Sequence, residues 1–332
     1  MRAWPTGHTA MKSNVIRLGL VVAAACFAVS GAGGAERVTV KDATGRSVTI
    51  ADSSRIVSIG GSVTEILYAL DLESRVVAVD TTSLYPPRAL SEKRNVGYMR
   101  QLSPEGVLGL APSLVLATEG AGPKGTIAVL EAASIPFVSV PDRFTGDGIL
   151  EKIRLIAQAT GSAERGACLV KLVEGDLGAL AALRARIVQP RRVLFILSFT
   201  NGRPMVAGRA TAADGILTLA GASNAVTDYD GYKLLNDESV IAARPDAVLV
   251  MERASFRLDA QTVFEHPAFA ATPAAAQRAL ISMEGLYLLG FGPRAARAAR
   301  DLALALYPSL DAPSAGAPLP SERPSTERAC AP

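Results

Sequence analysis

The sequence predicts an α/β fold in which two lobes are joined by one long α-helix. Short apolar segments alternate with helical patterns in both halves of the chain, which is typical of parallel sheets covered by helices. Between the halves, residues 162–188 carry apolar side chains at spacings of three and four, the repeat of one helix face. At about 1.5 Å per residue, this helix is about 40 Å long. Each half is therefore expected to form a Rossmann-like lobe beside it.

The same patterns divide the 332-residue chain into five segments. An apolar content of 49% is enough for two buried cores, whereas the Pro-, Ser- and Ala-rich end of the chain does not favour a packed structure. We expect a signal peptide over 1–35, an N-terminal lobe over 36–160, a connecting helix over 161–189, a C-terminal lobe over 190–310 and a disordered tail over 311–332.

The N-terminal segment has the order of a secretory signal. Lys12 and Arg17 precede an apolar run at 18–29, and small residues at 31–35 offer a cleavage site after Ala35. Translation can start at Met1 or at Met11. The prediction is export through a signal peptide, with lipoprotein anchoring at Cys26 as the alternative.

The N-terminal lobe is expected to open with a β-hairpin at 38–50, where apolar and polar residues alternate around Gly45. Ser62 or Thr64 can cap the next helix, and Ser103-Pro104-Glu105 offers an N-cap, a proline and a first-turn acid for a later one. A further helix is expected at 126–133. Apolar strands are predicted at 56–59, 76–79, 114–117 and 137–140.

The C-terminal lobe repeats this alternation. Strands are expected at 193–197 and 248–251, and helices at 213–220 and 295–306. Two segments have the same order of features, a glutamate, a helix, a break marked by proline and a buried strand: residues 105–118 and 238–251. A weaker match relates residues 64–70 to residues 214–220. Such units can recur by chance in α/β proteins; the alternative is a duplicated lobe.

The two matched segments lie farther apart in the N-terminal half, and the surplus falls between Leu70 and Glu105, where the loop at residues 80–100 lies. This segment holds Tyr85, followed by two prolines and Arg88. Loops on a rigid scaffold commonly carry binding residues, and prolines favour a preorganised loop. We therefore expect residues 80–100 to bind a ligand.

Charge and composition exclude several functions. A net charge of +3 argues against nucleic acid as the partner, because phosphate backbones need a basic face. We find no Ser/His/Asp set, Cys/His pair or phosphate loop, so no enzyme is predicted. The two histidines, His8 and His266, cannot build a His-rich metal site, and His266 is expected to cap or pack. Cys330 lies in the predicted tail, so no structural disulfide with Cys168 is expected.

Several motifs carry a family resemblance that covers residues 38–310. The motifs "GGSVTEILYAL", "VDTTSLYPP", "NVGYMRQLS" and "MEGLYLLGFGPR" resemble those of periplasmic haem-binding proteins of ABC-type haem importers. These proteins belong to the helical-backbone superfamily that also binds siderophores and cobalamin. The resemblance implies a class III periplasmic binding protein that holds haem between its lobes and delivers it to an inner-membrane ABC permease dimer with its ATPase. We expect a monomer.

The resemblance implies that Tyr85 is the axial ligand of the haem iron. A phenolate oxygen is a hard donor that suits ferric iron, and tyrosine is a known haem ligand. A nearby cation would stabilise the phenolate, and Arg88 is the candidate, although the family's basic residue matches Pro87 instead. The alternative for Tyr85 is an exposed tyrosine that packs on its own loop, and Tyr98 is the rival ligand.

Further pocket and docking residues follow from the resemblance. Arg253 is placed to reach haem propionates from the second lobe, or else is a solvated surface arginine. Weaker candidates for the apolar wall are Met205, Tyr229 and Tyr232. Acidic residues that dock on the permease are expected to be Glu65, with Asp214 or Glu238; each can instead stabilise a helix start.

Two other functions stay open at this stage. A ferric-siderophore or cobalamin carrier has the same architecture as a haem carrier, and some of the motifs are shared. A secreted α/β enzyme or a sensor domain is the alternative from another class.

Overall fold

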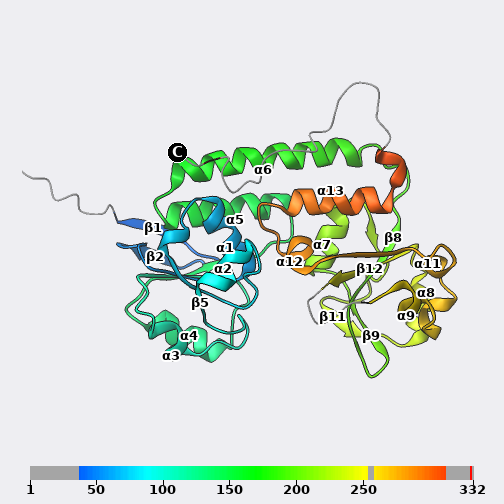
Figure 1. Ribbon diagram of the computed structural model, residues 1–332, viewed down its shortest axis with the longest axis horizontal. Helices are drawn as coiled ribbons and strands as arrows, with labels where there is room; N and C mark the ends of the chain where they lie inside the picture. Colours follow the sequence, from blue (N-terminus) through cyan, green and yellow to red (C-terminus); the bar gives the residue numbers. More distant parts are fainter. Residues whose placement is uncertain (1–36, 253–257, 312–329, 331–332) are drawn as a thin grey trace, which may run out of the picture. The chain divides into compact units, whose positions relative to one another are not determined.

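A computed structural model describes residues 37–252, 258–311 and Cys330. Two α/β lobes are connected by helix α6 (Ala163–Arg184), as predicted (Figure 1). The predicted signal peptide, the lipoprotein candidate Cys26, Arg253 and most of the predicted tail lie outside the described residues.

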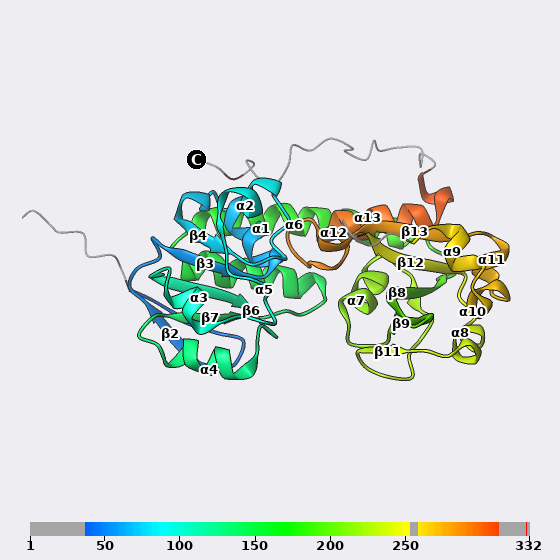
Figure 2. The same cartoon turned by 60° about the horizontal axis from the view of Figure 1, so that its bottom comes forward.

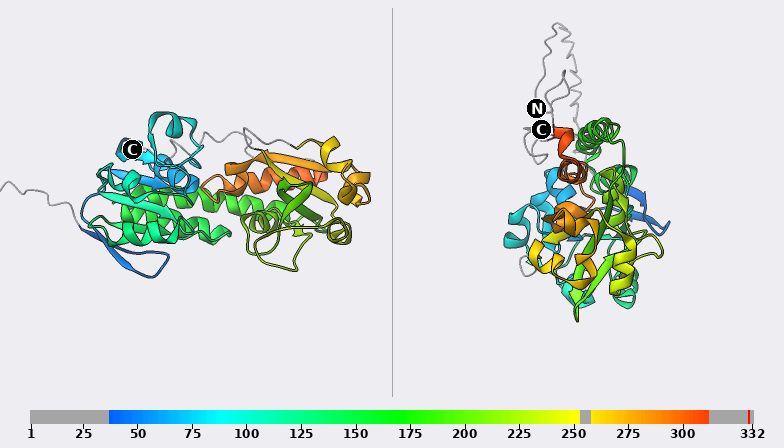
Figure 3. Two further views of the ribbon diagram at one scale, coloured as in Figure 1. Left: turned by 90° about the horizontal axis from the view of Figure 1, so that it is seen from below. Right: turned by 90° about the vertical axis from the view of Figure 1, so that its right-hand side faces the viewer.

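Lobe 1, the part of the chain before α6, contains the predicted hairpin and a parallel sheet. The hairpin pairs β1 (Val38–Lys41) with β2 (Ser47–Ile50) and packs beside α5 (Figure 3). The sheet order is β5 (Arg94–Asn95), β4 (Val76–Val79), β3 (Ile56–Ile59), β6 (Leu114–Thr118) and β7 (Phe137–Val140). The helices are α1 (Gly61–Ala69), η1 (Glu73–Arg75), α2 (Pro87–Glu92), α3 (Pro104–Leu108), α4 (Lys124–Ala132) and α5 (Gly146–Ala159).

The surplus segment at residues 80–100 is more regular than a loop. It contains α2 and β5, and β5 adds an edge strand that runs parallel to β4. Ser103 caps α3 as predicted, because its hydroxyl accepts from the Gly106 amide at 3.0 Å. Helix α1 differs from the prediction: it starts at Gly61 and has no side-chain cap.

Lobe 2 has a mixed sheet, whereas the strand–helix alternation predicted a parallel one. The strand order is β11 (Tyr232–Leu234), β9 (Arg203–Ala207), β8 (Arg192–Thr200), β12 (Ala247–Glu252) and β13 (Leu280–Glu284), with β10 (Ser223–Asn224) beside β8. Strands β8 and β9 are antiparallel, joined at Asn201-Gly202, where both residues have positive φ (51° and 73°). Asn-Gly is a strong hairpin signal that the sequence analysis missed.

The helices of lobe 2 follow the repeated unit. Helix α7 (Ala212–Leu219) corresponds to α1, and α8 (Asp237–Ala243) with β12 corresponds to α3 with β6, as the two matched segments predicted (Figure 2). His266 caps α10 through its ring, also as expected. The remaining helices are α9 (Ala260–Phe264), α10 (Pro267–Ala270), α11 (Pro273–Ala276), α12 (Gly285–Leu289), α13 (Ala295–Leu306) and η2 (Pro308–Asp311).

Helix α6 packs against α5 of lobe 1 and α13 of lobe 2 (Figure 1). Its apolar stripe includes Val170, Val173 and Leu180, which are buried as the spacing predicted. Gly166 is needed where α5 approaches, because a Cβ there would lie 2.3 Å from the Cβ of Ala157. A glycine that weakens an isolated helix therefore allows this close packing.

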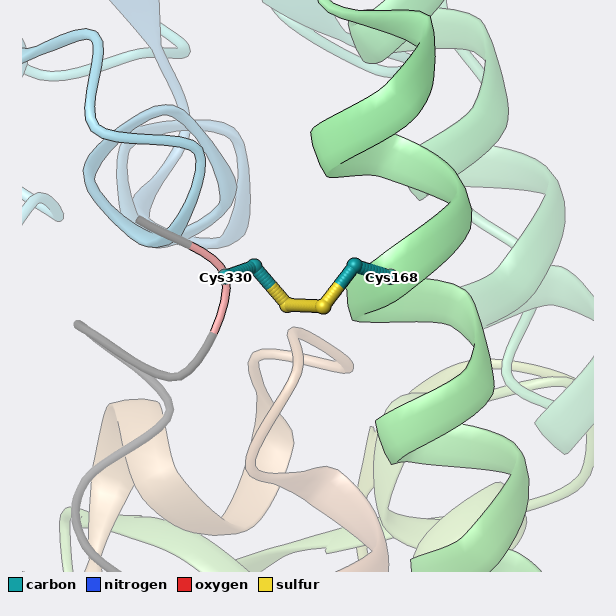
Figure 4. Close-up of a disulfide and its surroundings, with 2 residues drawn as sticks. All are labelled: Cys168 and Cys330. Atoms are coloured by element: carbon teal, nitrogen blue, oxygen red, sulfur yellow. A yellow bond between two sulfur atoms is a disulfide. The ribbon is translucent and has the colours of Figure 1, made fainter. Parts of the chain in front are cut away.

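The prediction that no structural disulfide forms was wrong. Cys168, on α6, is bonded to Cys330, although the two residues are 162 positions apart (Figure 4). Cys330 is buried, with 8% of its surface exposed, and belongs to the main hydrophobic core. The composition around Cys330 predicted disorder, but composition carries no information about a covalent partner this distant.

Asp42 anchors the hairpin, and its titration should be visible in the stability of the protein. Its buried carboxylate accepts from the Thr44 hydroxyl (2.7 Å) and from Arg46 Nη2 (2.6 Å). Burial alone would raise the pKa of Asp42, but these hydrogen bonds and the Arg46 charge lower it below its usual range. A depressed folded-state pKa means that the stabilisation is present above the unfolded-state pKa and is lost as the pH falls through the folded-state value.

We therefore expect the free energy of unfolding to fall on acidification from about pH 5 to about pH 2, and the fall to be smaller in Asp42→Asn. Chemical denaturation of both proteins across this range measures the difference. Parallel pH profiles for the two proteins would contradict this role of Asp42.

Candidate ligand-binding cleft

One cavity of about 1000 Å³ lies between residues of both lobes. Its size is at the upper end of the range for small-molecule sites. The lobe 1 wall comes from segments that follow β3, β4, β6 and β7, so it lies at the carboxyl edge of the parallel sheet, where α/β proteins commonly bind ligands. These lining residues are 60–62, Thr81, Thr82, Leu84, 98–100, Thr118, Glu119, Asp142 and Phe144. The lobe 2 wall is made by Leu197, 210–212, Gly231, Tyr232, Met251, Glu252, 284–286, Leu289 and Gly290.

A buried carboxylate holds two of these lining segments together. Asp80 is fully buried at the end of β4, and its oxygens accept from the amides of Gly60 (2.9 Å) and Thr82 (3.0 Å). They also accept from the hydroxyls of Thr82 (2.7 Å) and Ser83 (3.0 Å). A single side chain therefore fixes the turn after β3 and the start of the segment at 81–84.

Apolar side chains are exposed in this cavity. Six large apolar side chains are exposed among the described residues, and three of them, Leu84, Tyr98 and Tyr232, line the cavity. Exposed apolar surface that gathers in a concave site usually marks a binding site. Tyr98 and Leu84 come from lobe 1 and Tyr232 from lobe 2, so an apolar ligand would contact both lobes.

The charged lining is mostly acidic within the described residues. Four carboxylates, those of Glu119, Asp142, Glu252 and Glu284, line the cavity together with Arg100. Some of these carboxylates already accept hydrogen bonds. Glu284 caps α12 through the Leu286 amide at 2.9 Å, and Asp142 is paired with a lysine.

That lysine, Lys152, is fully buried behind the cavity wall. Its Nζ lies 2.7 Å from Asp142 Oδ1, 3.1 Å from Ser62 Oγ and 3.3 Å from the carbonyl of Phe291. Asp142 and Ser62 line the cavity, whereas Phe291 belongs to lobe 2. The ammonium group therefore ties two parts of the lobe 1 wall to the segment that precedes α13.

Tyr85 lies directly after the lining residue Leu84 and contacts an arginine that the sequence analysis did not select. The Arg294 guanidinium carbon is 3.5 Å from the centre of the Tyr85 ring. Arg294 also donates to Glu65 twice, from its amide to Oε1 (3.1 Å) and from Nη2 to Oε2 (3.0 Å). Burial alone would lower the pKa of Arg294, but the charge of Glu65 and its hydrogen bond raise it.

Arg88, the predicted cationic support of Tyr85, contacts another tyrosine. Its Nη2 lies 2.6 Å from Glu73, and its guanidinium lies over the ring of Tyr68 at 5.2 Å. Burial raises the pKa of Tyr68 to about 12. Arg88 is not among the residues that line the cavity, and neither is Tyr85.

Only some of the other residues predicted for the apolar wall of the ligand site lie at the cavity. Tyr98 and Tyr232 line the cavity, whereas Met205 and Tyr229 do not. Met205 lies on β9 beside β11. The Tyr229 hydroxyl donates to the Val206 carbonyl at 3.0 Å, and burial raises the pKa of Tyr229 to about 12. Arg253 lies outside the described residues.

The predicted docking residues have different surroundings. Glu65 is only 5% exposed and is paired with Arg294. Asp214 and Glu238 lie in the first turns of α7 and α8, where a negative charge also stabilises the helix. Glu238 is exposed, while Asp214 accepts from Asn224 Nδ2 at 3.2 Å. The docking role of all three stays a prediction.

Arg294 is the site residue that sequence reasoning missed. It ends the motif "MEGLYLLGFGPR", from which no site residue was selected, and α13 starts at the next residue. Its partner Glu65 is 229 residues away in the chain. A local pattern cannot indicate such a contact.

Within the described residues, none of the helices combines the length and the apolar character that a membrane span requires.

Comparison with known proteins agrees with this architecture. The periplasmic heme-binding protein RhuT from Roseiflexus sp. RS-1, solved in its apo form, is 40% identical with a TM-score of 0.72, and the match covers 78% of this chain and 100% of RhuT. The uncharacterized ABC transporter substrate-binding lipoprotein YvrC of Bacillus subtilis (strain 168) is 28% identical over 275 residues, 82% of this chain and 86% of YvrC.

A vitamin B12-binding protein from Pectobacterium atrosepticum is 26% identical over 201 residues, which cover 59% of this chain and 71% of that protein. The family model described as "Periplasmic binding protein" matches residues 56–285, more than half of the chain. The two lobes, the single connecting helix and this match lead to one conclusion: the chain belongs to the periplasmic binding protein family, in its class III form.

Proposed function

We propose that this protein is the periplasmic substrate-binding protein of a haem importer and that it binds haem between its lobes through Tyr85. The observation that carries the proposal is the exposed apolar lining of the cleft, with Leu84 and Tyr98 from lobe 1 and Tyr232 from lobe 2. Haem is a flat molecule with large apolar faces. Packing these faces against the three side chains would remove the apolar surface of both from water, which favours binding.

The surroundings of Tyr85 support it as the iron ligand. Tyr85 follows the lining residue Leu84, and its ring has a guanidinium at 3.5 Å. A cation beside a phenol favours the anionic oxygen that ferric iron binds. RhuT, which is 40% identical, is described as a heme-binding protein. YvrC is named an ABC transporter substrate-binding lipoprotein, so export to the periplasm and delivery to a permease dimer belong to the proposal.

A second cargo is supported by the acidic lining. Glu119, Asp142, Glu252 and Glu284 would repel the propionates of haem but would accept hydrogen bonds from amides. Cobalamin carries amide side chains, and a relative over part of the chain is a vitamin B12-binding protein. A corrinoid is therefore the second candidate.

Titration of residues 36–332 with ferric haem, and separately with cobalamin, tests the proposal. We expect an absorption spectrum of tyrosinate-bound ferric haem from the wild-type protein. Tyr85→Phe should lose this spectrum and bind haem at least about 100-fold more weakly, because even residues that only support a metal ligand contribute about 10–100-fold.

Tyr98→Phe is the matched control, because it also removes a phenol hydroxyl, in this case from a residue that lines the cavity. It should keep the tyrosinate spectrum. The reverse pattern would identify Tyr98 as the ligand, and tight binding of cobalamin with no haem spectrum would replace the proposed cargo.

A further inference from the structure

We propose that Glu65 and Arg294 are positioning residues for Tyr85. Glu65 holds the Arg294 guanidinium, the guanidinium holds the Tyr85 ring, and this fixes the direction of the hydroxyl. The inference rests on the proposed ligation of haem by Tyr85. It gives Glu65 a role in binding the cargo, whereas the sequence predicted either docking on the permease or stabilisation of a helix start.

The first observation is that Arg294 is fixed at two points. Its amide and its Nη2 donate to different oxygens of Glu65, at 3.1 and 3.0 Å. The carboxylate is 5% exposed and the arginine side chain 16% exposed, so water screens this ion pair little. The charge-assisted bond from Nη2 limits the rotation of the guanidinium, and the bond from the amide fixes the backbone that carries it.

The second observation is the close fit around this pair. A Cβ at Gly292 would lie 3.1 Å from the carboxyl carbon of Glu65, so the backbone before α13 rests on the carboxylate. The ring of Tyr287 lies 5.2 Å from the guanidinium carbon, and its hydroxyl donates to Asp301 at 2.8 Å. The guanidinium is therefore bounded by two aromatic rings and one carboxylate.

The third observation is that the contact with Tyr85 depends on a planar cation. The guanidinium carbon lies 3.5 Å from the centre of the ring, the distance of a face-to-face stack. Lysine offers a point charge and cannot reproduce such a stack. Arg294 Nε is buried and has no acceptor among the described residues, so one donor remains beside the ring.

These contacts join three parts of the chain. Tyr85 follows β4 and Glu65 lies on α1, both in lobe 1, whereas Arg294 precedes α13 in lobe 2. The orientation of the tyrosine therefore depends on a residue from the other lobe. The consequence is that a change at Glu65 should weaken cargo binding before any permease is present.

Three variants test the inference by haem titration and absorption spectroscopy: Glu65→Gln, Arg294→Gln and Arg294→Lys. We expect Glu65→Gln and Arg294→Gln each to weaken haem binding by about tenfold or more, as for the loss of a charge-assisted hydrogen bond. The charge-transfer absorption of the tyrosinate complex should shift in both variants. Arg294→Lys keeps the charge without the stack, and its spectrum should also shift. The double variant should bind no more weakly than Arg294→Gln alone, because both residues act through one contact.

Arg297→Gln is the matched control. It breaks an ion pair with Asp176, also at 3.0 Å, one turn further along α13. It should bind haem like the wild-type protein, and circular dichroism should show that all variants are folded. Wild-type affinity and spectrum in Glu65→Gln and Arg294→Gln would overturn the inference, as would an equal loss in Arg297→Gln. If the wild-type protein gave no tyrosinate spectrum, the proposed function would fail instead.

Discussion

Asp142→Ala should lower the free energy of unfolding by about 3–5 kcal/mol, because it leaves a buried ammonium group without its counter-ion. Lys152 is fully buried, and its Nζ lies 2.7 Å from the Asp142 carboxylate. Its other partners are the Ser62 hydroxyl and the Phe291 carbonyl, which are neutral. Hydrogen bonds to neutral groups do not replace the carboxylate, because the desolvation cost of the charge remains.

Lys152 is more deeply buried than Asp142, so comparing the loss of each partner gives a sharper test than the effect of Asp142→Ala alone. Lys152→Met removes the charge and keeps an apolar chain of similar length, while Asp142 remains 26% exposed and can be hydrated. We therefore expect Lys152→Met to cost less than Asp142→Ala. Urea denaturation of the three proteins measures both differences. A larger loss in Lys152→Met would contradict this order: it would mean that leaving Asp142, Ser62 and the Phe291 carbonyl without their donor costs more than an unpaired buried ammonium group.

Cys168→Ser should cost about 2–4 kcal/mol, the usual contribution of a native disulfide. The bond joins residues 162 positions apart, so its loss adds much conformational entropy to the unfolded chain. Denaturation without reductant should show the loss, and wild-type protein in reductant should match the variant. Cys330→Ser serves as the control, since either substitution opens the same bond. Two free thiols in unreduced protein, residues 36–332, would contradict the bond itself.

Most elements of the fold could be predicted because their signals are local. The apolar runs became β3, β4, β6 and β7, and α13 occupies the residues expected for it. Ser103 and Pro104 begin a helix for reasons that lie within a few residues. The long connecting helix was predicted from its apolar spacing, although it ends at Arg184, earlier than expected.

Some local signals were overlooked. Helix α5 was not predicted, although Ile149, Ile153 and Ile156 have helical spacing and are fully buried. The hairpin at Asn201-Gly202 had a recognisable turn signal, and it makes the sheet of lobe 2 mixed. Both features lie within the reach of sequence reasoning.

Other features depend on distant contacts. The bond between Cys168 and Cys330, and the contact between Glu65 and Arg294, join residues that no periodic pattern relates. The motif around Tyr85 lies next to the cavity, because Thr81, Thr82 and Leu84, which precede Tyr85, line it. The arginine expected beside it was Arg88, yet a residue of the other lobe occupies that place.

The hydrogen bonds of Asp80 have a consequence for how related proteins can acquire different cargoes. Because one carboxylate holds Gly60, Thr82 and Ser83, a substitution at Asp80 would move two lining segments of the lobe 1 wall together. Leu84 and Tyr98 lie in the same segment at residues 80–100, with 48% and 42% of their surface exposed, and neither takes part in the hydrogen bonds of Asp80. Selection for a new ligand can therefore act on the exposed side chains of the segment, while its buried base stays constant.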